Sequence, residues 1–413
     1  MVLWSGNLVS IVGTYGARIA YPLAVLHFSG SPALAGWVSF AVAAPGLLFQ
    51  VLAGIVADRS DRRLNLLACS LIALLAAGSA TACVLFHPGY VVAVLIACAA
   101  VEGTASAFFG TSEIAAVRDI VSEPQRLAAF SYYEAEQPVG IAVGRALGAA
   151  LYGVGRALPF LADGLSYVYS IASLSAVRGD FSPRAPGPGP HANRAWSGAV
   201  SGIRILWNGR FLRDSAVLTS FSNLVIQFVI ILVLVGGAEA GWPAWVSGAI
   251  LAGSGIGGIL ASFVAVPIVR RFRSEDVYAA GQWAMAACVS LVALSTRPWL
   301  WAVAMFSIGA VGTISSVAVT VYRVGAVPDS ALGSVIGTCA TLSNGGVALG
   351  GLAGGFALEE WGVSAAKSVL AAVMLAIAIL AVASVSRPNR NDPLEPAEHN
   401  GEPNVPACSL DRL

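Results

Sequence analysis

The stretch Gly54-Ile-Val-Ala-Asp58-Arg59-Ser-Asp-Arg62-Arg63 is a short charged loop between two long apolar runs. The rest of the chain carries little charge: of its 413 residues, 57% are hydrophobic and only 11% are charged. Soluble domains carry about 25% charged residues, so we expect most of this surface to face lipid. The net charge of +1 argues against nucleic acid as a partner.

Long apolar runs lie on both sides of this loop and along the remaining chain. A helix that spans a bilayer needs roughly 20 mostly apolar residues, and the sequence contains about 12 such runs. The runs are continuously apolar rather than alternating, which favours helices over a β-barrel. The expected fold class is therefore an all-α membrane protein with about 12 transmembrane helices.

The basic residues indicate how these spans are oriented. Of the 23 Lys and Arg residues, 18 fall in one set of alternate loops, 3 in the opposite set, and 2, Arg18 and Arg145, inside spans. Because basic loops stay on the cytoplasmic side, both termini and the 54–63 loop are expected to be cytoplasmic. The expected location is the cell membrane, crossed several times.

The sequence divides near its middle. Residues 178–213 form the only long loop between the expected spans, and the Pro- and Gly-rich run at 182–190 cannot be a helix. We expect an N-terminal six-helix half at 1–177, this cytoplasmic linker at 178–213, a C-terminal six-helix half at 214–385 and a disordered cytoplasmic tail at 386–413.

The two expected halves repeat each other. Trp37-Val-Ser39 recurs as Trp245-Val-Ser247, and the same offset carries Arg62-Arg63 onto Arg270-Arg271. Parallel repeats of six spans are typical of transporters whose substrate site lies at mid-membrane between the halves. Both halves also contain glycines spaced by four residues. This spacing permits close helix packing, and it would provide a surface on which spans could rock. These helix-packing glycines are Gly140, Gly144, Gly148, Gly346, Gly350 and Gly354.

With these features, the chain resembles the major facilitator superfamily over essentially all of residues 1–385. The family's loop between spans 2 and 3 reads Gly-x-x-x-Asp-Arg-x-Gly-Arg-Arg/Lys, and here Asp61 replaces the second glycine. The resemblance implies a latch that joins the halves when the cavity faces outward. The alternative is a basic cytoplasmic anchor, which would not need Asp58. The matching latch residues are Gly54, Asp58, Arg59, Arg62 and Arg63.

Four further segments, at 18–22, 29–33, 159–167 and 327–334, resemble the branch that contains the enterobactin exporter. This resemblance implies efflux of a drug, siderophore or secondary metabolite by a proton antiporter, which would exchange the cargo for protons. An importer or uniporter of the same fold stays open, because Arg145 stands where the family's span-5 antiporter motif has proline. The family's arginine in span 4 is also replaced in this chain.

Ionisable side chains inside spans cost at least ~2.5–3.5 kcal/mol at mid-bilayer, so each is a candidate for proton coupling or substrate binding. Arg18 and Glu102 fall at the same depth and are expected to pair, either for coupling and gating or as a structural ion pair. Arg145 and Asp163 match nearer the outer side, where a structural pair is favoured. Glu134 lies near the cytoplasmic mouth, where it is either hydrated or in contact with substrate.

Other classes of function lack the residues that they need. The sequence has no His-Glu-x-x-His or Gly-x-Ser-x-Gly pattern and no P-loop, so we expect neither an enzyme nor a cofactor. The 6 Cys and 4 His residues lack metal-ligand spacing, so no metal site is expected. A membrane sensor or scaffold would more readily carry a soluble domain. The expected partners are a small-molecule substrate, protons and the lipid bilayer, and we expect a monomer.

Overall fold

The computed structural model describes residues 2–87, 89–120, 126–176 and 202–385. Across these ranges the chain is built of helices and contains no strand. Eight of the helices in the described ranges are long and apolar enough to cross a membrane, and the two shorter apolar helices are residues 32–48 and 139–154. The predicted all-α membrane fold is confirmed.

The first half is a bundle in which α2 and α3 follow one another after a single non-helical residue, Phe49. Pro45 lies one turn before this break, and its ring removes one hydrogen bond of the helix. The helices of this half are α1 (Val2–Ser29), α2 (Pro32–Leu48), α3 (Gln50–Arg59), α4 (Arg62–Phe86), α5 (Val91–Ile120), α6 (Arg126–Val154) and α7 (Leu158–Ala176).

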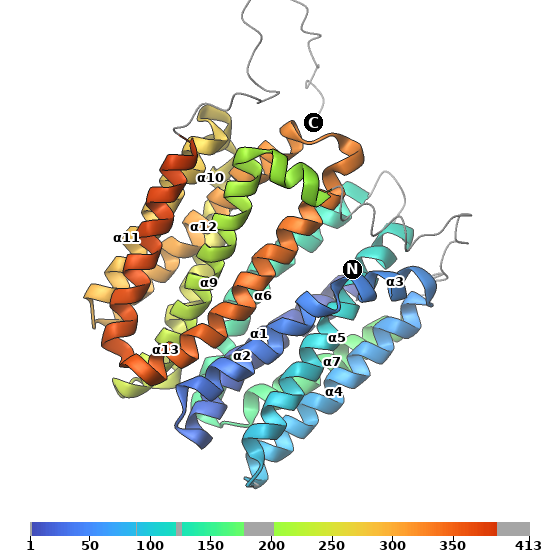
Figure 1. Ribbon diagram of the computed structural model, residues 1–413. Helices are drawn as coiled ribbons and strands as arrows, with labels where there is room; N and C mark the ends of the chain where they lie inside the picture. Colours follow the sequence, from blue (N-terminus) through green and yellow to red (C-terminus); the bar gives the residue numbers. More distant parts are fainter. Residues whose placement is uncertain (1, 88, 121–125, 177–201, 386–413) are drawn as a thin grey trace, which may run out of the picture.

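The second half ends in a helix that turns back on itself. Gly362 has a φ of 72°, which glycine adopts without a steric penalty, and the two parts of α13 run in opposite directions (Figure 1). Counting these parts separately, and α2 with α3 as one, each half has six membrane-length segments. The helices of this half are α9 (Arg210–Glu239), α10 (Ala244–Arg271), α11 (Ser274–Leu294), α12 (Pro298–Ala326) and α13 (Asp329–Val385).

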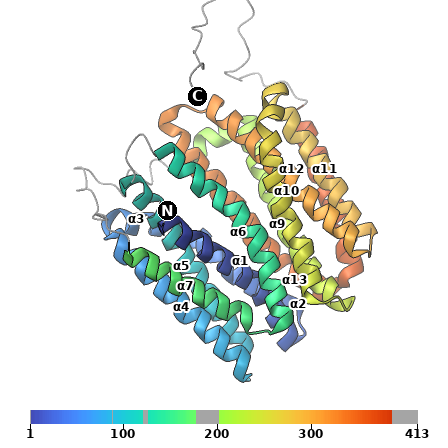
Figure 2. The ribbon, with the colours of Figure 1, turned by 180° about the vertical axis from the view of Figure 1, so that it is seen from behind.

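Helices pack closely within each half, and the halves meet along two seams. In the first half α1 packs on α6 and α7, and α4 packs on α5 and α7; in the second, α9 packs on α13 and α10 on α12. The halves touch where α2 packs on α13 and where α6 packs on α10, as the opposite views in Figures 1 and 2 show. We call these contacts the α2–α13 seam and the α6–α10 seam.

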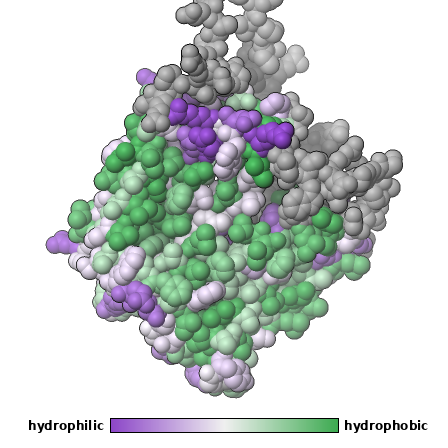
Figure 3. All heavy atoms as spheres, viewed as in Figure 1, coloured by the Kyte–Doolittle hydropathy of each residue, from purple (hydrophilic) through white to green (hydrophobic). Residues whose placement is uncertain are grey.

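The outside of the bundle is apolar. Phe263, Leu165 and Leu294 are largely exposed, and Leu294 has a relative accessible surface of 89%. Figure 3 shows hydrophobic residues covering most of the side of the bundle, with hydrophilic residues gathered toward its ends. Such a surface is stable against hydrocarbon, and helices satisfy their own backbone hydrogen bonds there. The chain is a multi-pass membrane protein.

Candidate functional site

A cavity of about 440 Å³ lies between the two halves. Helices α1, α2, α5 and α6 of the first half line one wall, and α9 and α13 of the second half line the other. Its volume falls in the range of pockets for drug-sized molecules, about 300–1,000 Å³. The hydrogen-bonding and charged residues of its lining include Arg18, Ser106, Arg145, Asn223, Gln227 and Asn344.

Arg18 enters the cavity from α1. Its Nη2 donates a hydrogen bond to Ser106 Oγ on α5 at 3.5 Å, and its guanidinium lies over the ring of Tyr15, 4.9 Å from the centroid. Its Nε is buried and has no hydrogen-bond partner in the described part of the chain. No described hydrogen bond occupies its Nη1, so Arg18 keeps a donor for a molecule in the cavity that it lines.

Glu102 lies on α5 and is buried, with 5% of its surface exposed. Its Oε1 accepts a hydrogen bond from Tyr21 Oη on α1 at 2.7 Å. Arg18 in turn binds Ser106, one turn from Glu102 on α5, but no ion pair within 4.0 Å joins Arg18 and Glu102 among the described residues. The structure thus brings the two predicted partners into one region and gives each a neutral hydrogen-bond partner.

Arg145 and Asp163 also have separate partners. Arg145 Nη1 donates to Ser254 Oγ on α10 at 2.9 Å, so this hydrogen bond crosses the α6–α10 seam. Asp163 is fully buried on α7; its Oδ1 accepts from Ser166 Oγ at 3.5 Å, and its Oδ2 has no hydrogen-bond partner among the described residues. No hydrogen bond or ion pair joins Arg145 and Asp163 in the described ranges.

The glycines predicted to pack helices lie inside each half. Gly144 and Gly148 press α6 against α1, close to Gly16, and Gly140 meets Ile11 of α1. In the second half, Gly346, Gly350 and Gly354 press α13 against α9. The two stripes therefore occupy equivalent places in the repeat, and both join helices of the same half.

Other glycines form the seams between the halves. A Cβ added to Gly36 on α2 would lie 2.7 Å from the carbonyl oxygen of Gly351 and 2.9 Å from the Cα of Gly355, both on α13. On the other seam, Gly255 of α10 packs against the backbone of Ala142 of α6. These contacts bring backbone against backbone across the halves.

The charged loop begins a helix. Asp61 is the N-cap of α4, and its Oδ1 accepts from the backbone N–H groups of Arg63 at 2.8 Å and Leu64 at 3.2 Å. Arg63 Nη2 donates to the carbonyl oxygen of Ser175 on α7 at 2.8 Å, and Arg62 is buried. A Cβ added to Gly54 would meet nothing within 4 Å. The side chains of Asp58, Arg59 and Glu134 lie outside the described residues.

Glu359 makes a polar contact between α13 and the start of α2 that could not be predicted from the sequence. Its Oε2 accepts hydrogen bonds from Ser31 Oγ and from the backbone N–H of Ala33 at 2.8 Å, so a carboxylate on α13 holds the start of α2. Ser31 is also the N-cap of α2 and accepts from Leu34 N at 3.2 Å. The pair Ser31-Pro32 signals a helix start in the sequence, but nothing there identifies its partner.

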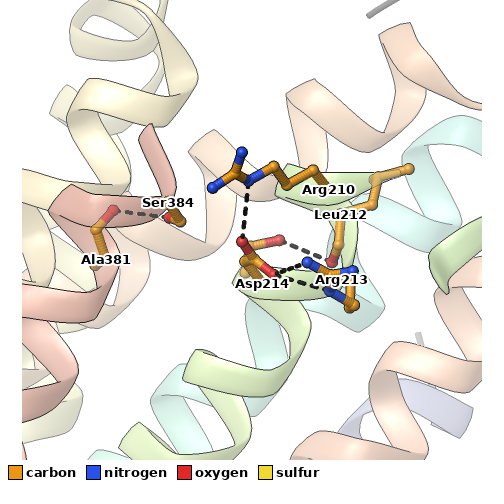
Figure 4. Close-up of polar contacts among 7 residues, drawn as sticks. Arg210, Leu212, Arg213, Asp214, Ala381 and Ser384 are labelled. Carbon is orange, nitrogen blue, oxygen red and sulfur yellow. Dashed lines mark hydrogen bonds and ion pairs between the residues drawn. The ribbon is translucent and has the colours of Figure 1, made fainter. Parts of the chain in front are cut away.

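A second cavity, of about 310 Å³, lies where α9 begins beside the end of α13. Asp214 Oδ1 lies 2.9 Å from Arg213 Nη2, and its Oδ2 lies 3.8 Å from Arg210 Nε, as Figure 4 shows. Ser384 on α13 donates to its own helix, to Ala381 O at 2.7 Å. The aspartate offsets two arginines at a helix start, where the helix dipole disfavours positive charge.

Comparisons with known proteins agree with this architecture. The nucleoside transporter NupG shares the fold with a TM-score of 0.74 and 13% identity, and the match covers 94% of this chain and 99% of that one. A bacterial homologue of the iron transporter ferroportin in an inward-facing state matches with a TM-score of 0.72 and 14% identity over 94% of this chain and 98% of that one. An auto-inhibited POT family peptide transporter matches with a TM-score of 0.70 and 13% identity over 96% of this chain and 98% of that one. At such identities the likeness concerns the fold alone. No curated protein matches the sequence.

A family model described as transmembrane secretion effector matches residues 1–411, nearly the whole chain. The match agrees with the two six-helix halves and with the cavity between them. The chain therefore belongs to the transmembrane secretion effector family, and it is a membrane transporter of the major facilitator superfamily.

Proposed function

We propose that this transporter exports a small organic molecule across the cell membrane by alternating access. The observation that carries the proposal is the cavity of about 440 Å³ whose walls come from both halves. When the halves rock against each other, such a cavity can open first to one side of the membrane and then to the other. Export is also what the secretion description of the family and the resemblance to the enterobactin-exporter branch favour.

The direction in which the cavity opens supports loading from the cytoplasm. The two halves converge near the start of α2 and diverge toward α3 (Figure 1), and Gly54 and Gly333 have no neighbour where a Cβ would lie. The excess of basic residues in the loops at this diverging end favours a cytoplasmic location, with both termini on the same side. An exporter binds its cargo in this inward-facing state.

Proton antiport is the driving force that we propose. The buried carboxyl groups of Glu102 and Asp163 lie near the cavity and inside the membrane, where carboxyl groups commonly relay protons. Glu134, whose sequence position places it toward the cytoplasmic mouth, is a further candidate. Glu102→Gln keeps an acceptor for Tyr21 but cannot release a proton, so it should abolish transport driven by a pH gradient. Transport that still follows the gradient in this variant would exclude Glu102 from coupling.

Expression in an efflux-deficient host tests export. Cells that carry the transporter should accumulate less of some compounds in a panel of drugs, siderophores and metabolites than cells without it. Asp58→Asn removes the latch carboxylate and should restore accumulation, with membrane levels of the protein as the control. Export by rocking is excluded if no compound is depleted, or if depletion is the same in Asp58→Asn.

An importer or uniporter of the same fold is the second candidate. The observation that favours it is Arg145, which stands at the place of the antiporter-motif proline and crosses the α6–α10 seam to Ser254. Higher accumulation of a compound in cells that express the transporter, without dependence on a pH gradient, would support this candidate instead.

A further inference from the structure

The two walls of the central cavity differ in charge. Among the described residues that line it, the charged ones are Arg18 and Arg145, and both belong to the first half. The two side chains line the same cavity, Arg18 from α1 and Arg145 from α6. A molecule that enters the cavity therefore meets two positive charges on one side.

The nearby carboxyl groups stand behind this layer. Glu102 is buried and occupied by Tyr21, and Asp163 is fully buried beside Ser166. Neither residue lines the cavity. The arginines are therefore the charged groups that a bound molecule can touch.

The arginines also keep free hydrogen-bond donors. Arg18 makes one long hydrogen bond, from Nη2 to Ser106, and no described hydrogen bond occupies its Nη1. Arg145 uses Nη1 for Ser254, and no described hydrogen bond occupies its Nη2. A guanidinium binds carboxylate, sulfonate or phosphate oxygens through two parallel N–H groups, which a neutral ligand cannot match.

The opposite wall is neutral and amphipathic. Asn223 and Gln227 on α9 and Asn344 on α13 present amides to the cavity, and the described hydrogen bonds leave these amides unoccupied. Apolar lining residues of the same two helices surround these amides: Ile226, Ile230, Ile231 and Val347. This wall suits an apolar body that carries a hydrogen-bonding group.

We propose that the cargo is an amphipathic organic anion, whose carboxylate, sulfonate or phosphate binds Arg18 and Arg145 while its body packs against α9 and α13. The inference rests on the proposed function and specifies the substrate class for it. It also bears on the driving force: a membrane potential that is negative inside drives an anion outward, so export of such a cargo proceeds down the electrical gradient.

Binding of matched acids and amides to the purified full chain tests the charge requirement. Dansylglycine is compared with dansylglycinamide, and naphthalene-1-sulfonate with naphthalene-1-sulfonamide, in an uncharged detergent at low salt. We expect each acid to bind at least tenfold more tightly than its neutral partner. The proposal is overturned if the amides bind as tightly as the acids, or if neither acid binds.

Substitutions assign the effect to the two arginines. Arg18→Gln and Arg145→Gln should each bring the acid-to-amide affinity ratio close to one, and Arg18→Lys should keep most of it. Arg297→Gln, which removes an exposed arginine at the start of α12, should leave the ratio unchanged. If Arg145→Gln does not fold, the comparison of Arg18→Gln with Arg18→Lys decides. An unchanged acid-to-amide affinity ratio in Arg18→Gln overturns the proposal.

The binding test and the export test fail independently. If the host assay shows depletion of neutral or cationic compounds alone, export stands and the anion proposal falls. If the purified chain prefers acids but no compound is depleted from cells, the anion site stands and export falls.

Discussion

The two ends of the interface between the halves differ in how closely the backbones approach. At one end, where α2 begins, Gly36 lies against Gly351 and Gly355, and Glu359 of α13 holds the N–H of Ala33. At the other end, toward α3 and the start of α13, Gly333 and Gly337 have no atom within 4 Å of a Cβ position. The halves are closed at the first end and apart at the second.

This difference shows what kind of contact a rocking transporter can make and release. Interdigitated side chains would have to be pulled apart in each cycle, because packed interiors are dense and stiff. Contacts between glycine backbones are close but smooth, so they can form at one end while they open at the other. Glu359 adds a polar contact at the rim, where water can replace it.

The largest expected effect comes from breaking the closed end with Gly36→Val. The valine side chain would collide with the backbone of Gly351 and Gly355, which cannot move as a flexible side chain can. Overpacking of this kind costs about 1–3 kcal/mol, and it acts on the closed end alone. We expect the transport rate to fall about tenfold or more, because a change of about 1.4 kcal/mol in the free-energy difference between the two conformations changes their population ratio tenfold.

Reactivity of a cysteine at the closed end provides the second readout for Gly36→Val. In a cysteine-free background, Ser39→Cys, which lies beside Gly351, should react faster with an impermeant maleimide from outside the cell when Gly36 is valine. The matched control is Gly78→Val on α4, where a Cβ meets nothing within 4 Å. Equal transport and equal labelling in the two valine variants would show that the Gly36 contact is not required.

A smaller effect is expected from Glu359→Gln. The amide keeps an oxygen for Ser31 and Ala33 but loses the negative charge that strengthens both hydrogen bonds. The closed end should open more often, with a several-fold rise in labelling of Ser39→Cys and little change in the amount of folded protein. Glu360→Gln, one residue further along α13, is the control; an equal rise in both variants would contradict a specific role for Glu359.

The fold could be predicted from the sequence because each span carries its own signal. Long apolar runs, the basic loops and the repeated Trp-Val-Ser segments need no knowledge of neighbours. The break at Phe49 could not be predicted, because Pro45 kinks a helix only where the surroundings allow it.

The site could be predicted in part. Arg18 and Arg145 are recognisable as charges inside spans, and both line the cavity. Their partners could not be predicted, because depth along a helix says nothing of its rotation: Arg145 faces Ser254 of the other half. The role of Glu359 could not be predicted, because an acid near a turn between spans costs little and is common there.

The smallest effect, and the one that tests the open end, is expected from Gly337→Ala on α13. Nothing lies within 4 Å of the added methyl group, and alanine favours a helix over glycine by about 0.5–1 kcal/mol, so the conformation in which this end is open should be slightly more stable against unfolding. If α2 and α13 approach each other at this position when the halves rock to the opposite conformation, the transport rate should nevertheless fall by a factor of about two to five. This factor corresponds to roughly the same free energy as the gain in helix stability. Thermal unfolding and vesicle transport measure the two quantities. A variant that is more stable and transports at the unchanged rate would mean that this face of α13 stays apart from the first half throughout the cycle.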